Sequence, residues 1–168
     1  MDKTSLSSYY LQVAIKSFRG LKKLGEKTFA QLVAEDYFWK PNEEANSIAI
    51  LMQHLSGNML SRWTDFLTTD GEKPNRNRDS EFEDSLKDKE GLMAAWEKGW
   101  SCLFAALDQL SEEDLLKTVY IRSEPHSVIQ AIERQVSHYS VHLGQIVLLA
   151  KLRKGEQWQT LSIPKRKV

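Results

Sequence analysis

The stretch Gln135-Val136-Ser137-His138-Tyr139-Ser140-Val141-His142-Leu143-Gly144-Gln145 lies inside an apolar-periodic run that extends from about Val128 to Leu152. Apolar residues recur through this run in steps of three and four, at Ile129, Ile132, Val136, Tyr139, Leu143, Ile146 and Ala150. That period predicts an amphipathic helix whose seam packs against other helices. Ser127-x-x-Gln130 is a typical helix start, and Gly155 is a typical helix stop.

Three earlier segments have the same helical period. The first two span roughly Ser5 to Ala34 and Ser47 to Leu67. The third follows capping-box patterns at Ser80-x-x-Glu83 and Ser85-x-x-Asp88 and reaches Leu110. Thr118–Ile121 looks extended. Four long amphipathic segments predict an all-α fold, a four-helix bundle, in which periodicity does not decide whether the connections are short or crossing. We expect one domain over residues 1–168, with residues 156–168 as a non-helical tail.

The composition limits the class of protein. The chain has 168 residues, 41% of them hydrophobic, and 23 Lys+Arg balance 23 Asp+Glu. This neutral charge argues against nucleic acid as a partner. The single cysteine, Cys102, cannot form an intramolecular disulfide, and neither a signal peptide nor a membrane span is visible. We therefore expect a cytoplasmic protein that binds neither nucleic acid nor membranes.

The most informative polar residues are histidines. His138 and His142 are spaced i, i+4, which places both imidazoles on one face of a helix, one turn apart. Catalytic zinc usually takes three protein ligands, and His54, at the edge of the second segment's apolar stripe, is a candidate for the third. The alternative interpretation is that these histidines are partly exposed polar residues on helix flanks.

Other chemistries have weaker support. No Glu-x-x-His pair, His-Glu-x-x-His motif, Gly-rich phosphate loop or Gly-x-Ser-x-Gly elbow occurs. Cys102 falls among apolar residues, where an inert buried thiol is the simpler interpretation. Arg62, Arg76 and Arg78 are suited to binding an anionic substrate group, although a solvated charged loop is the alternative for the polar stretch from Thr68 to Asp79.

Several separate blocks, in order, resemble the DinB-like superfamily of metal-binding bundles, and within it an uncharacterised Bacillus-type branch. The blocks are Pro41-Asn42 with Asn46-Ser47-Ile48, Gln53-His54-Leu55-Ser56-Gly57-Asn58, Phe66-Leu67-Thr68-Thr69-Asp70-Gly71-Glu72-Lys73-Pro74, Arg76-Asn77-Arg78-Asp79, residues 134–145 and Leu161-Ser162-Ile163-Pro164. Together they cover nearly the whole chain.

The resemblance implies a four-helix bundle with up-up-down-down connectivity, often a homodimer. It also implies a divalent metal ion, Zn or Ni, held by His54, His138 and His142. Some relatives are thiol S-transferases that use low-molecular-weight thiols, and an open divalent site is able to lower the pKa of a thiol. We therefore expect either a metal-dependent enzyme, with substrate binding by Arg76 and Arg78, or a non-catalytic stress-related scaffold. A metal-dependent hydrolase is a further alternative, because zinc-bound water can act as a nucleophile.

Overall fold

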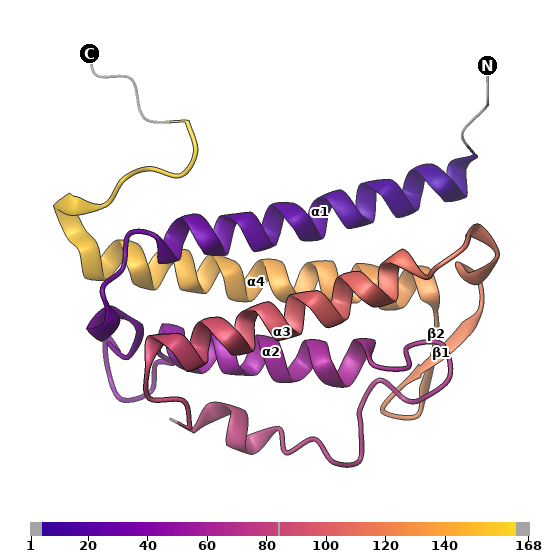
Figure 1. The fold of residues 1–168 in the computed structure, drawn as a ribbon, viewed down its shortest axis with the longest axis horizontal. Coiled ribbons are helices and arrows are strands. Elements are labelled where there is room, and N and C mark those ends of the chain that lie inside the picture. The colour runs from indigo at the N-terminus through magenta and orange to yellow at the C-terminus, as the bar shows by residue number, and fades with distance from the viewer. Residues whose placement is uncertain (1–4, 84, 164–168) are drawn as a thin grey trace.

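A computed structural model describes residues 5–83 and 85–163. Its four long helices are α1 (Leu6–Phe29), α2 (Ile48–Trp63), α3 (Lys89–Asp108) and α4 (Val128–Lys154), and they lie side by side as a bundle (Figure 1). Each begins after a residue whose side chain accepts a hydrogen bond from a backbone N–H of the first turn, namely Ser5, Ser47, Asp88 and Ser127. The predicted bundle of four helices is therefore present.

The capping-box prediction for the third helix was wrong. Ser80 lies in a short 3-10 helix, η2 (Asp79–Phe82), and its hydroxyl donates to the Asn77 carbonyl 2.9 Å away. The Asp88 carboxylate instead accepts from Gly91 N–H at 2.7 Å and starts α3. The described residues between α2 and α3 consequently contain only the short helix η2, and this connection supplies part of the site.

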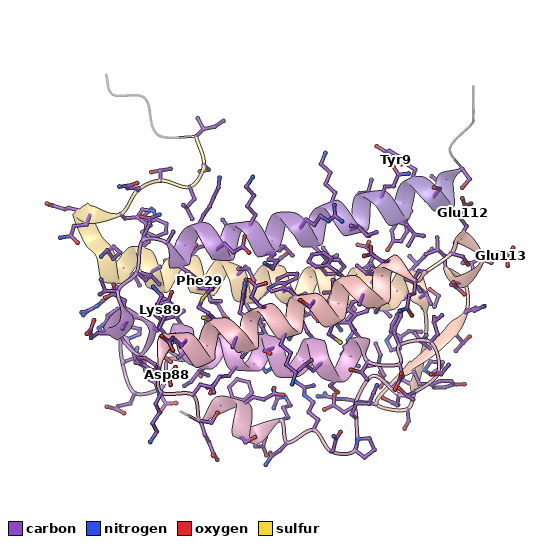
Figure 2. All side chains as sticks on the ribbon, in the orientation of Figure 1. Tyr9, Phe29, Asp88, Lys89, Glu112 and Glu113 are labelled. Atoms are coloured by element: carbon purple, nitrogen blue, oxygen red, sulfur yellow. The ribbon has the colours of Figure 1, made fainter. Side chains whose placement is uncertain are left out.

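The directions of the helices follow from the pairs of residues that touch. Gln53 contacts Leu86, and Ser56 donates to the Ala95 carbonyl, so α2 and α3 run parallel. Tyr10 contacts Glu133 and Gln31 contacts Gln159 beyond the end of α4, so α1 and α4 also run parallel. Figure 2 shows Phe29, at the end of α1, on the same side of the molecule as Asp88 and Lys89, so the two pairs are antiparallel.

The structure thus does not confirm the up-up-down-down order. The directions in chain order are up, down, down and up (Figure 1). The physical reason is the long connection between α2 and α3, which returns the chain to the end where α2 began. Periodicity within each helix carries no information about such a crossing.

A small hairpin joins α3 to α4. Its strands, β1 (Thr118–Ile121) and β2 (Glu124–Ser127), pair antiparallel, so the extended interpretation of Thr118–Ile121 is confirmed, while β2 was not predicted. The turn residues Arg122 and Ser123 have φ of 54° and 64°, values typical of a tight hairpin turn. Both of their N–H groups donate to the Asp70 carboxylate, at 2.9 and 2.7 Å. The hairpin tip is thereby tied to the α2–α3 connection.

The largest buried side chains between the helices are aromatic. The Trp63 indole N–H donates to the Tyr139 hydroxyl at 3.1 Å, and that hydroxyl donates to Asn58 Oδ1 at 3.0 Å. These bonds satisfy buried polar groups and fix the rotation of α4 relative to α2. As a result, His138, the residue before Tyr139, lies on the side of α4 that faces α2.

The end of α4 agrees with its stop signal. Gly155 adopts φ of 54°, which favours glycine, and a single 3-10 turn, η4 (Gly155–Gln157), follows. Residues 158–163 form no helix, and the rest of the predicted tail, residues 164–168, lies outside the described residues.

In the described part of the chain, none of the helices combines the length and apolar character needed to span a membrane.

A close contact between α1 and α3 gives a test of this packing. A Cβ at Gly25 would lie 2.6 Å from Cζ2 of the buried Trp96, whereas one at Gly20 on the same helix would meet nothing within 4 Å. Gly25→Ala should therefore lower the free energy of unfolding by about 1–3 kcal/mol through overpacking. Gly20→Ala should raise it by about 0.5–1 kcal/mol through helix propensity. Urea denaturation measures both, and a stabilised Gly25→Ala would contradict the contact.

Candidate metal centre

Three histidines from two antiparallel helices meet beside the α2–α3 connection. His54 comes from α2, and His138 and His142 come from α4. Their ring centroids are 4.6 to 5.3 Å apart, and one nitrogen of each ring lies within 4.8 Å of the others. Imidazole nitrogens are common protein ligands of zinc and also bind nickel. The arrangement can hold a metal ion.

The orientation of His54 is set by a carboxylate. His54 is 4% exposed, and its Nδ1 lies 2.9 Å from Oε2 of Glu81, in η2. Because a carboxylate only accepts, Nδ1 carries the proton and Nε2 keeps its lone pair for another partner. A carboxylate behind a histidine is the usual support of a metal-binding imidazole, since it fixes both the tautomer and the ring.

Glu81 is in turn held by Arg76. The Arg76 guanidinium donates from Nε to Oε1 at 2.7 Å and from Nη2 to Oε2 at 2.8 Å, and its Nη1 donates to Glu72 at 3.1 Å. Burial alone would raise the pKa of Glu81, but the hydrogen bonds from His54 and Arg76 outweigh it and lower the pKa. Glu81 therefore stays ionised.

The two histidines of α4 have different surroundings. His142 Nδ1 lies 2.8 Å from the Gln145 side-chain oxygen, to which it donates in its neutral form. The Nε2 of His138 is buried and has no hydrogen-bond partner among the described residues. Burial, followed by the nearby His142 and His54, lowers the pKa of His138 to about 3, and burial also lowers the pKa of His142. Neutral imidazole is the form that binds metal, so the donor set fits a divalent cation.

A cavity of about 590 Å³ opens in front of the three rings. Its lining on α2 is His54, Asn58 and Arg62, and its lining on α4 includes Arg134, His138 and His142. Both sets follow i, i+4, i+8 spacing, so each forms one stripe along its helix. The hairpin tip adds Arg122, and the α2–α3 connection adds Arg76, Arg78 and Phe82. The cavity has a histidine end and an arginine-rich wall.

The structure places the sequence-predicted residues as follows. The three predicted ligands lie together, namely His54, His138 and His142. The Arg76 guanidinium donates its hydrogen bonds to Glu81 and Glu72. Arg78 is half-exposed at the rim, with its guanidinium 5.1 Å from the centre of the Phe82 ring. The interpretation of residues 68–79 as a simple solvated loop was wrong for Arg76, which is buried together with Arg62.

Four further residues of the site were not predicted from the sequence: Glu81, Phe82, Arg122 and Arg134. Phe82 covers the His54 ring at a centroid distance of 4.8 Å. Arg134 stands four residues before His138, and this spacing could have identified it as a member of the same stripe. No local pattern marks Glu81, because 27 residues separate it from His54 and only the fold of the connection brings them together.

Removing the charge of Glu81 should weaken the fold. Glu81→Gln leaves the buried Arg76 without its full ionic partner and His54 without its carboxylate, so we expect a loss of roughly 2–4 kcal/mol in the free energy of unfolding. The control is Asp79→Asn, because Asp79 is 95% exposed and its ion pair with Arg78 spans 4.0 Å. Equal stability of both variants in denaturant titrations would contradict a structural role for the Glu81 bonds.

Comparison with known proteins places the chain in a family. The family model described as "Protein of unknown function (DUF1572)" matches residues 5–167. No curated protein matches the chain. The match includes all four helices, the hairpin and every residue of the histidine cluster. This protein therefore belongs to the DUF1572 family.

Proposed function

We propose that the protein binds one divalent metal ion, zinc or nickel, at His54, His138 and His142 and uses it as an enzyme on a small molecule. The observation that carries the proposal is the hydrogen bond from His54 to the buried Glu81 beside two further imidazoles. One of these, His138, has a buried nitrogen without a hydrogen-bond partner among the residues that the structure describes. A buried carboxylate that orients a histidine toward an adjoining cavity is typical of metal centres.

The favoured reaction is transfer of a low-molecular-weight thiol to an electrophile. A divalent metal supplies the lowered thiol pKa that makes a thiolate available near neutral pH. The chain supplies the rest: Glu81 fixes the ring of His54, Phe82 shields that ring from one side, and the cavity admits a small molecule. The resemblance to DinB-like proteins supports the same reaction class and a homodimeric assembly.

The thiol belongs to the substrate rather than to the chain. Cys102, on α3, does not line the cavity of the histidines. Its sulfur lies 3.5 Å from the Thr64 hydroxyl, and the residue borders a separate cavity together with Trp63 and Phe66. A nucleophilic role for Cys102 at the metal would need this part of α3 to move across the bundle.

Metal binding is tested first, on full-length protein purified without a histidine tag. We expect about one equivalent of zinc or nickel per chain by elemental analysis, with a higher melting temperature than after chelation, because a ligand that binds only the folded state stabilises it. His138→Ala should lose the metal and this stabilisation. His126→Ala, in β2 and outside the cluster, is the matched control. A melting temperature that does not change when zinc or nickel is added would contradict the proposal.

Activity separates the thiol transferase from the alternatives. The metal-loaded protein is incubated with a low-molecular-weight thiol and an electrophile such as a chlorodinitroarene, and conjugation is followed by absorbance. We expect thiol-dependent turnover that His138→Ala abolishes while the fold is retained. Turnover of an activated ester without thiol would instead support the hydrolase. A metal-stabilised protein inactive in both assays and across a substrate screen would support the non-catalytic scaffold.

A further inference from the structure

Arg62 is a buried cation with unused hydrogen-bond donors. It is 3% exposed, and its Nε and Nη1 have no hydrogen-bond partner in the described part of the chain. Among the described residues, its closest carboxylate oxygen is Glu72 Oε2, 3.8 Å from Nη2, which is too long for a hydrogen bond. A guanidinium keeps its charge even when buried, so an unpaired one is costly to the fold. Such a residue points to a missing partner.

The carboxylates around Arg62 are already shared. Glu72 also accepts from Arg76 at 3.1 Å and lies 3.5 Å from Arg122, while Glu81 is held by Arg76 and His54. The Asp70 carboxylate is a third acidic group here. Burial would raise its pKa, but backbone hydrogen bonds, one of them from Arg122, and the charge of Arg62 lower it. Three carboxylates therefore balance Arg62, Arg76 and Arg122, and the excess positive charge comes from Arg134. Among the described residues, Arg134 takes part in no ion pair at all, and its charge acts on Arg62 across the cavity. The arginine-rich wall carries a clear surplus of positive charge.

The position of this surplus relative to the histidines is fixed by the two helices. Arg62 lies eight residues from His54 on α2, and Arg134 lies four residues from His138 on α4. With a rise of 1.5 Å per residue, these offsets correspond to about 12 Å and about 6 Å along the helix axes. Both arginines line the same cavity as the three histidines. A small molecule of several bonds' length spans that distance.

We propose that Arg62, with Arg134 at the cavity rim, forms an oxyanion subsite for a carboxylate or phosphate group of the substrate, whose reacting group lies at the three histidines. Guanidinium groups bind both oxyanions through paired N–H donors. The position of the reacting end rests on the proposed metal function, whereas the subsite consists only of side chains of this protein. The substrate class is therefore a small anion that carries its charge about 6–12 Å from the reacting atom.

A purely structural role for Arg62 predicts a different response to mutation. The residue packs closely on Gly71, since a Cβ there would lie 2.4 Å from Nη1, and a structural arginine would be needed for this packing. If Arg62 is kept for ligand binding, the fold should not need it when no ligand is bound, because an apolar side chain of similar length removes a buried charge that is only partly paired. Arg62→Met should then melt at the same or a higher temperature than wild type in anion-free buffer.

The test is calorimetric titration of the full-length, metal-free protein with succinate and, separately, with inorganic phosphate. We expect saturable binding by wild type and an affinity lowered by about tenfold or more in Arg62→Met, since hydrogen bonds to charged groups are lost. Arg62→Lys keeps the charge without the paired donors, so its affinity for the anions should lie between those of wild type and Arg62→Met. Arg134→Met should also weaken binding, and because Arg134 is exposed this variant keeps its fold. Tighter binding of succinate than of phosphate assigns a carboxylate, and the reverse order assigns a phosphate.

The control is Arg19→Met, because Arg19 is exposed on α1 beside Phe104 and outside the cavity. Its affinity for both anions should equal that of wild type. Wild-type affinity in both Arg62→Met and Arg134→Met would overturn the subsite, as would the absence of saturable binding to wild type. Because no metal is present, these outcomes leave the metal proposal intact. Conversely, a chain that binds the anions but never zinc or nickel would refute the metal function and leave the subsite standing.

Discussion

The hydrogen bond between His54 and Glu81 is the contact on which the site depends. It joins the interior face of α2 to η2, a short element in the connection that carries the chain back to the start of α3. Arg76 fixes Glu81 from the other side with two hydrogen bonds, so buried ionic contacts hold this connection in place. Without Glu81, neither the tautomer of His54 nor the path of this connection would be specified.

The rest of the site follows from two antiparallel helices that face each other. Stripes with a four-residue repeat on α2 and α4 each run from histidine to arginine, and the bond between Tyr139 and Asn58 sets their rotation. The cavity between them therefore has a histidine end and a cationic wall. Keeping Arg62 buried and incompletely paired among the described residues costs stability, and we attribute this cost to the proposed oxyanion subsite.

Much of the framework could be predicted from the sequence. The four helices and the grouping of His54 with His138 and His142 follow from apolar periodicity and from the resemblance, because these signals are local or shared with a family. Helix directions could not be derived, since they depend on where the α2–α3 connection crosses the bundle. The role of Glu81 and the incomplete pairing of Arg62 could not be predicted either, because both depend on contacts between residues far apart in the sequence. Strand β2 was missed because Pro125 and Ser127 look like the start of a helix.

X-ray absorption spectroscopy of the zinc- or nickel-loaded, tag-free protein examines the proposed centre directly. We predict the multiple-scattering signature of imidazole ligands, with a best fit of three histidines and no sulfur from the chain, and one imidazole fewer in His54→Ala. A bound metal whose spectrum lacks imidazole scattering, or is unchanged in His54→Ala, would contradict a centre built on His54, His138 and His142.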